Sequence, residues 1–403
     1  MIQPRLVLPA ARKELTSDLI QLFIGPRQAG KTTLLHQLEQ ELRSAGRPTL
    51  FLNLEDPEVL ELLDRSPKEL LNLLPASTEH KVTVFIDEIQ YLTDPSRFLK
   101  YLYDDHRDRV KLVVSGSSAF YIDQKFRDSL AGRKRLFRVL TLSFREFLSF
   151  KGFRELSVAD FTKLSLTERD QLIPAYQEYL RFGGYPRVVL ATEEREKISI
   201  LQDLAYSYLK KDLYEGGIRH EEVFYKLLKL LSRQVGGLMN VSELAKTLQV
   251  TQTAISHYLM ILQKSFHICL IRPFFRNIRK ELKKMPKAFF YDLGMRNFFA
   301  GNLSPYPIRE DKGSLLENAA FRQLIEHFDP LDLHFWRLND DLELDFIVKE
   351  SLAYEVKTQP ERFKKKRYQF FHEQYPEVEI KLLTMANQAS AHQGTTVLPV
   401  WQI

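Results

Sequence analysis

The sequence predicts an α/β protein whose first domain is built on a parallel β-sheet and is followed by further, smaller domains. A short apolar segment, LIQLFI, leads through a glycine-containing turn into an amphipathic helical segment, and two more apolar segments, KVTVFID and VKLVVSG, follow. Apolar strands that alternate with helices are typical of parallel sheets. At 403 residues the chain is too long for one ordinary core, so we expect about two to four domains.

The composition is typical of a folded, water-soluble protein, with 44% hydrophobic and 27% charged residues. No apolar run approaches the roughly 18–20 residues that span a bilayer, and the N-terminal segment lacks the apolar stretch of a secretory signal. The single cysteine, Cys269, excludes an intrachain disulfide and a cysteine-rich zinc site. We therefore expect a cytoplasmic protein that does not associate with membranes.

The charge balance is mildly basic, with a formal net charge of +6. This balance fits an acidic partner such as nucleic acid, although many enzymes share it. One basic run alone is typical of a solvated surface, but three runs beside three separate motifs favour a role in binding. The runs contain Arg133, Lys134, Arg135 and Arg138; Arg276, Arg279, Lys280, Lys283, Lys284 and Lys287; and Arg362, Lys364, Lys365, Lys366 and Arg367.

The segment GPRQAGKT, residues 25–32, matches the pattern G-x-x-x-x-G-K-T of a phosphate-binding loop. Its glycines let backbone N–H groups surround a phosphate, and the following helix N-terminus adds partial positive charge. Lys31 would reach the β- and γ-phosphates, and the Thr32 hydroxyl would ligate Mg²⁺. We expect ATP or GTP to be bound by Gly25, Pro26, Arg27, Gln28, Ala29, Gly30, Lys31, Thr32 and Thr33.

The segment KVTVFIDEIQ supplies the second half of this site as an apolar strand that ends in two acids. Asp87 would hold Mg²⁺, and Glu88 would polarise the attacking water. A strand that simply ends in two solvated carboxylates is the alternative. The adjacent acids favour hydrolysis over a small-molecule kinase, which has no need of a water-activating glutamate.

Two further polar residues are candidates for the same site. Ser115 stands at the end of the apolar segment VKLVVSG, a position that lies between the acidic strand and the γ-phosphate in a parallel sheet, so we expect it to sense the nucleotide. Arg133 follows a glycine and has no obvious role within its own subunit. We expect it to reach a neighbouring subunit's nucleotide in a homo-oligomer, and the alternative is a nucleic-acid phosphate.

The middle of the chain is predicted to be helical from about residue 149 to 217, a natural lid over the nucleotide domain. Gly183 and Gly184 before Tyr185-Pro186 predict a turn. From residue 240 the sequence predicts a helix-turn-helix with Ser242 and Thr251 as N-caps. The exposed face of its second helix would carry Gln252, Thr253, Ser256 and His257.

Two β-rich stretches, SFHICLIRPFF and KAFFYD, flank the basic segment RNIRKELKKMPK after the helix-turn-helix. This order predicts a winged helix whose wing carries Lys280, Lys283 and Lys284. Winged helices bind DNA or dock proteins, so both roles stay open.

The last hundred residues place acids and a lysine at a spacing that favours a metal site. Glu317 lies in an amphipathic helix, and Lys349-Glu350-Ser351 is predicted to be a hairpin turn between LELDFIV and LAYEVK. Residues two apart on a strand share a face, so Glu355 and Lys357 point together, and Asp345 on the paired strand faces the same side. Glu317, Asp345 and Glu355 would hold Mg²⁺, and Lys357 would activate water. The alternative is a half-exposed strand with an ion pair.

These segments together resemble a large prokaryotic family of archaeal-type AAA+ ATPases. The segments GPRQAGKTTLL, VFIDEIQ, VSGSS, AGR, LSFREFL, FGGYP, FFYDLGMRNF, LLENAAF, LELDFIV and YEVK occur in the family's order between Leu19 and Lys357. The resemblance implies an AAA+ P-loop domain at residues 1–150, a helical lid at 151–220, a winged helix at 221–300, and a restriction-endonuclease-like domain of PD-(D/E)XK type at 301–403. Ser115 replaces the asparagine that is common in the wider AAA+ class.

The resemblance and the motifs imply an ATP-hydrolysing, DNA-binding protein with ATP and Mg²⁺ as cofactors. We expect it to act on branched or single-stranded DNA in genome maintenance or defence, as a homo-oligomer such as a hexameric ring. Whether the C-terminal domain is a metal-dependent nuclease stays open. The alternative is an ATP-driven switch or scaffold whose winged-helix and nuclease-like domains dock protein partners.

Overall fold

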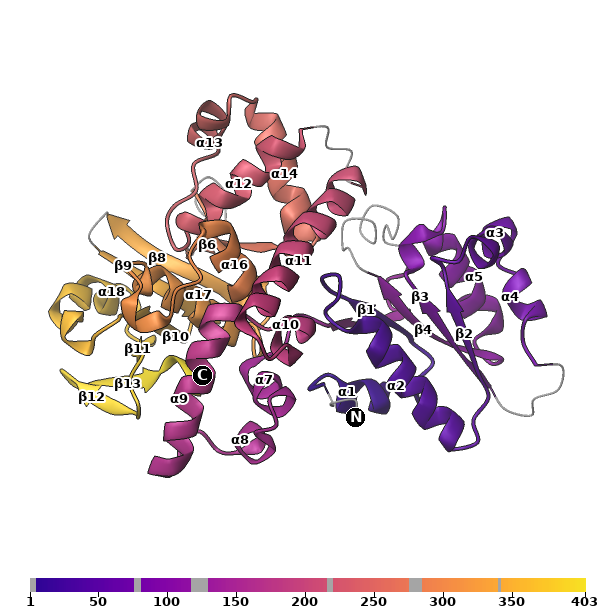
Figure 1. Cartoon of the computed structure of the whole chain (residues 1–403), viewed down its shortest axis with the longest axis horizontal. Coiled ribbons are helices and arrows are strands. Elements are labelled where there is room, and N and C mark those ends of the chain that lie inside the picture. Colours follow the sequence, from indigo (N-terminus) through magenta and orange to yellow (C-terminus); the bar gives the residue numbers. More distant parts are fainter. Residues whose placement is uncertain (1–4, 76–80, 117–129, 216–219, 275–284, 340–341) are drawn as a thin grey trace. The chain divides into compact units, whose positions relative to one another are not determined.

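The computed structural model describes residues 5–75, 81–116, 130–215, 220–274, 285–339 and 342–403. The chain folds into two compact units, residues 1–141 with 264–266, and residues 142–263 with 267–403. Each unit contains its own β-sheet, and Figure 1 shows the first in indigo and violet and the second in orange and yellow. Across the described ranges, no helix has the length and apolar character needed to cross a membrane.

The first unit contains a five-stranded sheet in the order β2-β3-β4-β1-β5. Every neighbouring pair runs parallel, which confirms the predicted parallel sheet. The strands are β1 (Ile20–Ile24), β2 (Thr49–Asn53), β3 (Val82–Asp87), β4 (Val110–Gly116) and β5 (Lys134–Arg138). The described helices are α1 (Leu8–Glu14), α2 (Lys31–Ser44), α3 (Pro57–Arg65), α4 (Glu69–Asn72), η1 (Ile89–Tyr91) and α5 (Pro95–His106).

The strand order determines which residues meet at the carboxyl edge of this sheet. Strand β4 lies between β1 and β3, with Phe23 beside Ser115 and Ile86 beside Val114 in the register. Helix α2 is fixed to the sheet by buried side chains such as Leu35, which belongs to the same hydrophobic cluster as Phe23. The ends of β1, β4 and β3 therefore lie next to one another at the start of α2.

The second unit begins with helices and continues into a mixed sheet. Its helices are α7 (Phe144–Phe150), α8 (Arg154–Val158), α9 (Leu166–Phe182), α10 (Pro186–Leu190), α11 (Glu194–Glu215), α12 (Glu221–Arg233), α13 (Val241–Leu248), α14 (Gln252–Lys264), α16 (Leu293–Ala300), α17 (Lys312–Leu324) and α18 (Gln369–Gln374). The predicted helical character of the middle segment is confirmed within the described residues. Its buried residues share one hydrophobic cluster with α16, α17 and strands of the sheet.

The sheet of the second unit has eight strands in the order β12-β13-β11-β10-β9-β8-β6-β7. They are β6 (Ile268–Pro273), β7 (Lys287–Phe290), β8 (Leu333–Asn339), β9 (Leu342–Val348), β10 (Leu352–Val356), β11 (Glu379–Thr384), β12 (Ser390–His392) and β13 (Thr395–Pro399). The predicted β9–β10 hairpin is confirmed, with Lys349 and Glu350 at φ 47° and 57° in its turn. Because β6 pairs with β8, the sheet runs across the predicted boundary between residues 300 and 301, and the four-domain division stays a prediction.

The helix-turn-helix segment is formed by α13 and α14. Asn240, and not Ser242 as predicted, caps α13, because its side chain accepts hydrogen bonds from the amides of Ser242 and Glu243 at 3.0 and 3.3 Å. Thr251 caps α14 as predicted, through Ala254 N at 3.1 Å. The β6–β7 hairpin follows, but the predicted basic wing lies outside the described residues.

The exposed face of α14 largely follows the prediction, since Gln252, Thr253 and Ser256 are exposed and His257 is half-buried. The wing residues that lie outside the described ranges are Lys280, Lys283 and Lys284.

The glycine pair in FGGYP has a packing role beyond the predicted turn. Gly183 has a φ of 73°, and a Cβ there would lie 2.4 Å from Asp292 Oδ1. The Asp292 carboxylate accepts hydrogen bonds from Gly184 N at 2.8 Å and Met295 N at 2.9 Å. The end of α9 and the start of α16 are therefore joined by one buried carboxylate, which needs glycine at position 183 to approach.

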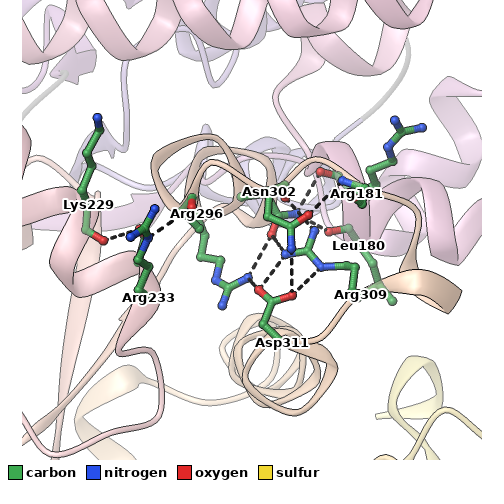
Figure 2. Close-up of polar contacts among 12 residues, drawn as sticks. Leu180, Arg181, Lys229, Arg233, Arg296, Asn302, Arg309 and Asp311 are labelled. Carbon is green, nitrogen blue, oxygen red and sulfur yellow. Dashed lines mark hydrogen bonds and ion pairs between the residues drawn. The ribbon is translucent and has the colours of Figure 1, made fainter.

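A second buried polar network joins the same helices to the start of α17 (Figure 2). Asp311 accepts hydrogen bonds from Arg309 Nε and Nη2, both at 2.8 Å, and pairs with Arg296. Asn297 donates to the carbonyls of Leu180 and Arg181 at 2.8 and 2.9 Å. Arg296 and Arg309 are 1% and 4% exposed, so Asp311 provides the negative charge between two buried cations.

We expect Asp311→Asn to lower the free energy of unfolding of the second unit by about 3 kcal/mol at pH 7, because it leaves two buried arginines without their carboxylate partner. Burial alone would raise the Asp311 pKa, but Arg309 and Arg296 lower it from 3.8 to about 2. Since the folded-state pKa is lowered, this stabilisation is present above about pH 4 and is lost as the pH falls through about 2.

Urea unfolding followed by tryptophan fluorescence reports on this unit alone, because both tryptophans, Trp336 and Trp401, belong to it. The matched control is Asp203→Asn on the exposed surface of α11, which should change little. Equal stability of wild type and Asp311→Asn at pH 7 would contradict the expectation.

Candidate functional site

The phosphate-binding loop connects β1 directly to α2, and its two glycines are required by the backbone. A Cβ at Gly25 would lie 1.9 Å from the carbonyl oxygen of Val139. Gly30 has a φ of 95° immediately before the first residue of α2, a conformation that favours glycine. Of the other predicted loop residues, Pro26 and Ala29 are buried, Arg27 is half-buried, and Gln28 and Thr33 are exposed. The loop therefore has the shape that the pattern G-x-x-x-x-G-K-T predicts.

Lys31 lies over the loop rather than in solvent. Its side chain is buried, and Nζ donates to the carbonyl oxygens of Gly25 at 3.0 Å and Pro26 at 2.9 Å. Arg5, which no sequence pattern identified, also binds the loop. It donates from Nη1 to Ala29 O at 2.6 Å and from Nη2 to Leu140 O at 2.8 Å. No motif surrounds Arg5, so the sequence carried no signal for this role.

Asp87 is the centre of a chain of hydrogen bonds at the carboxyl edge of the sheet. The Thr32 hydroxyl donates to Asp87 Oδ2 at 2.7 Å, and the Ser115 hydroxyl donates to Asp87 Oδ1. Ser115 Oγ in turn accepts from Glu88 N at 3.1 Å. The structure thus brings together Thr32, Asp87, Ser115 and Glu88, which come from three separate segments of the chain.

The oxygens in this chain fit a hard divalent cation. Thr32 and Asp87 present a hydroxyl and a carboxylate next to the loop, and Mg²⁺ binds one or two such groups together with phosphate oxygens and water. Thr32 and Asp87 are therefore the residues that would hold Mg²⁺ here.

Glu88 is held in an unusual backbone conformation. Its φ of 58° and ψ of 50° place a non-glycine residue in the left-handed region, which costs about 1–2 kcal/mol. Its carboxylate accepts a hydrogen bond from Gln90 Nε2, and Gln90 is 4% exposed. Gln90 is thus a positioning residue that the sequence analysis missed, although it belongs to the motif DEIQ.

Arg133 differs from the expectation. Its guanidinium binds both carboxylate oxygens of Asp104, from Nε at 2.7 Å and from Nη2 at 3.2 Å. The hydrogen bond from Arg133 lowers the pKa of Asp104. Arg133 therefore has an ion-pair partner within its own subunit. Its action on a neighbouring subunit stays a prediction and would require this ion pair to open.

A second candidate site is a cavity of about 280 Å³ in the second unit. Acidic and basic residues line it together, and several of the basic ones belong to the third basic run. The lining residues are Gly236, Arg337, Glu343, Asp345, Glu355, Lys357, Arg362, Lys364, Arg367 and Tyr368. Three residues of the third basic run, Arg362, Lys364 and Arg367, thus lie beside the candidate C-terminal site, and the role of this run in binding stays a prediction.

The strands β9 and β10 bring three of the predicted residues together. Lys357 Nζ pairs with Glu355 Oε1, which places the two side chains on one side as predicted. Asp345 Oδ2 accepts a hydrogen bond from Val356 N at 2.7 Å, beyond the last paired residues of the β9–β10 ladder. Glu355 is 2% exposed, and its Oε2 makes no hydrogen bond within the described parts of the chain.

Glu317 contacts Lys287 of β7, and Lys287 also contacts Asp345. Lys287 Nζ lies 3.1 Å from Glu317 Oε1 and 3.8 Å from Asp345 Oδ1, and it also pairs with Glu343. The sequence analysis counted Lys287 as part of a basic run and missed this buried position. Glu317 does not line the cavity. Within the described residues, no group of three or more His, Cys, Asp or Glu side chains is placed to hold a metal ion.

Glu317 and Asp345 thus contact Lys287, while Glu355 contacts Lys357. The role of Glu317, Asp345 and Glu355 as metal ligands stays a prediction. Burial and the charges of Asp345 and Glu343 raise the pKa of Glu317 to about 7, against the opposing effect of Lys287. Burial and the charge of Asp345 raise the pKa of Glu355 to about 8. For Lys287, burial acts to lower the pKa, but the surrounding carboxylates outweigh it and raise the pKa.

Comparison with known families identifies the type of domain in the first unit and gives no function for the second. Residues 17–148 match the family model described as an AAA domain. Residues 173–305 and 312–403 match two models described as domains of unknown function, DUF8612 and DUF4143. With the loop and strand geometry above, the first unit contains a P-loop AAA-type domain.

Similar proteins and structures add little about function. The chain is 26% identical over 342 residues to an uncharacterized protein of Methanocaldococcus jannaschii, covering 83% of this chain and 73% of that protein. It is 26% identical over 346 residues to an uncharacterized protein of Haemophilus influenzae, covering 83% and 80%. The solved structure of C. elegans PCH-2 is 18% identical, covers 50% of this chain and 59% of that chain, and gives a TM-score of 0.31.

We expect Glu88→Gln to retain nucleotide binding and to lower turnover by about a hundredfold or more, because the residue that would polarise water is lost. Lys31→Ala should lose nucleotide binding, and Ser115→Ala should lower kcat more than it raises KM. Binding of a fluorescent ATP analogue and steady-state phosphate release separate these outcomes. Glu58→Gln, on the exposed first turn of α3, is the matched control. Wild-type turnover in Glu88→Gln would contradict the role given to Glu88.

The pair of Arg133 and Asp104 allows its two roles to be separated. If Arg133 completes a neighbouring subunit's site, Arg133→Ala should lose ATPase activity and still bind ATP, whereas Asp104→Ala should retain activity because it removes the carboxylate that competes for the arginine. ATPase rates measured over a range of protein concentrations, with sedimentation of the same samples, check this. Equal losses in the two variants would show that only the ion pair within the subunit matters.

Proposed function

We propose that this chain is an ATP-hydrolysing enzyme that works as a homo-oligomer and binds DNA through its second unit. The observation that carries the enzymatic part is the hydrogen-bonded chain of Thr32, Asp87, Ser115 and Glu88 at the carboxyl edge of the parallel sheet. Each of these residues has one task that hydrolysis requires, and the sheet places all of them beside the phosphate-binding loop.

The roles follow from these positions. Lys31 would leave the loop carbonyls and bind the β- and γ-phosphates of ATP, while the loop amides surround them. Mg²⁺, when bound by Thr32 and Asp87, would neutralise charge that develops on the phosphate oxygens. Glu88, oriented by Gln90, would accept the proton of the attacking water. Ser115 would link the two acids, so that a change at the γ-phosphate alters the position of Glu88.

DNA binding is proposed from the charges of the second unit. Exposed Arg362, Lys364 and Arg367 lie beside a concave site, and cations in this arrangement suit a phosphate backbone. The exposed polar face of α14 offers a second contact to DNA. Single-stranded or branched DNA fits the proposal because a cavity with cations at its edge can receive a strand end or a displaced strand.

We expect the double charge reversal Arg362→Glu/Arg367→Glu to weaken binding of single-stranded and forked DNA. It should also reduce the slope of log K against log salt by about 0.7 for each lost phosphate contact with a single strand. Fluorescence anisotropy over a salt series measures both, and ATPase activity with and without each DNA shows whether binding is coupled to hydrolysis. Arg195→Glu on α11 is the exposed control.

An unchanged affinity and salt slope in the double variant would contradict DNA binding at the cavity. A protein with ATPase activity and no salt-dependent DNA binding at all would favour the alternative of an ATP-driven scaffold that docks proteins.

A further inference from the structure

Three carboxylates beside the C-terminal cavity already share contacts with one cation of the chain itself. The Lys287 ammonium contacts Glu317, Glu343 and Asp345, and the Lys287 side chain is 1% exposed. A second cation placed among the same carboxylates would have to share them with this ammonium. At a separation of about 4 Å, two like charges near a protein surface repel by about 4 kcal/mol per pair of unit charges.

The remaining oxygens of these carboxylates are restricted as well. Asp345 Oδ2 is bound to the amide of Val356 at 2.7 Å. Glu317 Oε2 faces Gly236, where a Cβ would lie 2.1 Å from it. Gly236 has a φ of 77°, so the backbone bends closely around the carboxylate at this point. Glu317 therefore has little freedom to turn toward a metal ion in the cavity, and Asp345, which lines the cavity, has one of its two oxygens already bound.

We propose that the Lys287 ammonium takes the place of a divalent cation among Glu317, Glu343 and Asp345, so that these three carboxylates hold no metal ion in the wild type. The strand β7, the helix α17 and the strand β9 are joined through this ammonium. Replacing Lys287 by an apolar side chain of similar length removes the ammonium that Glu317, Glu343 and Asp345 share. Glu343 keeps its ion pair with Arg337 at 3.1 Å, and the oxygens that faced Lys287 create a divalent-cation site. The inference goes beyond the proposed function and does not depend on ATP hydrolysis or DNA binding.

The test measures Mn²⁺ binding to the full chain without nucleotide, by electron paramagnetic resonance of free Mn²⁺. Wild type and Asp345→Asn should bind Mn²⁺ equally. Lys287→Met should gain one further ion with an affinity at least about tenfold higher than any wild-type site in the second unit, and Lys287→Met/Asp345→Asn should lose this gain. The control Lys381→Met removes a lysine of the same sheet that pairs with the single acid Glu379 at 3.4 Å.

Two results would overturn the proposal. One is Mn²⁺ binding by the wild type that Asp345→Asn removes, and the other is a folded Lys287→Met variant that gains no ion. If Lys287→Met is unstable, Mn²⁺ should raise the melting temperature of this variant and leave the melting temperature of Lys381→Met unchanged. Tryptophan fluorescence measures both temperatures. If the variant does not fold at all, the comparison of wild type with Asp345→Asn decides alone. Equal Mn²⁺ binding by the wild type and Asp345→Asn then supports the proposal, and weaker Mn²⁺ binding by Asp345→Asn refutes it.

Discussion

The second unit depends on the buried ammonium of Lys287. It comes from β7, and it neutralises carboxylates from α17 and β9 in a region where an unpaired acid would be costly. Asn318, next to Glu317 on α17, binds both the amide and the carbonyl of Phe290 at 2.9 and 2.8 Å. Glu317 and Asn318 of α17 thus contact the first and last residues of β7. These contacts hold the segments KAFF and LLENAAF together.

Asp292 and Asp311 are likewise charged side chains that connect neighbouring helices. Asp292 joins the end of α9 to the start of α16, and Asp311 joins α16 to α17 through Arg296 and Arg309. These contacts tie the helices of residues 142–324 into one hydrophobic core with the sheet. A buried hydrogen bond specifies one arrangement of helices, because any other arrangement leaves its donor or acceptor without a partner.

The first unit uses a different arrangement, in which function follows from strand order. Because β4 separates β1 from β3, Ser115 at the end of β4 lies between the loop and the acids and binds Asp87 and the Glu88 amide together. The left-handed backbone of Glu88 is maintained by these contacts and by Gln90. The two units therefore place charge in different ways: the first gathers hydroxyl and carboxylate groups beside its glycine-containing loop, and the second surrounds a buried lysine with carboxylates.

The sequence by itself determined the phosphate-binding loop, the acidic strand, the helix-turn-helix and the β9–β10 hairpin, because each is a local pattern of glycine, apolar and capping residues. It also determined that Glu355 and Lys357 share a side, since side chains alternate along a strand. Only the tertiary structure decided that Arg5 supports the loop, that Arg133 pairs with Asp104, and that Lys287 lies among the predicted metal ligands. Each of these contacts joins residues at least 24 positions apart, and no local pattern specifies which distant partner a charged side chain will meet.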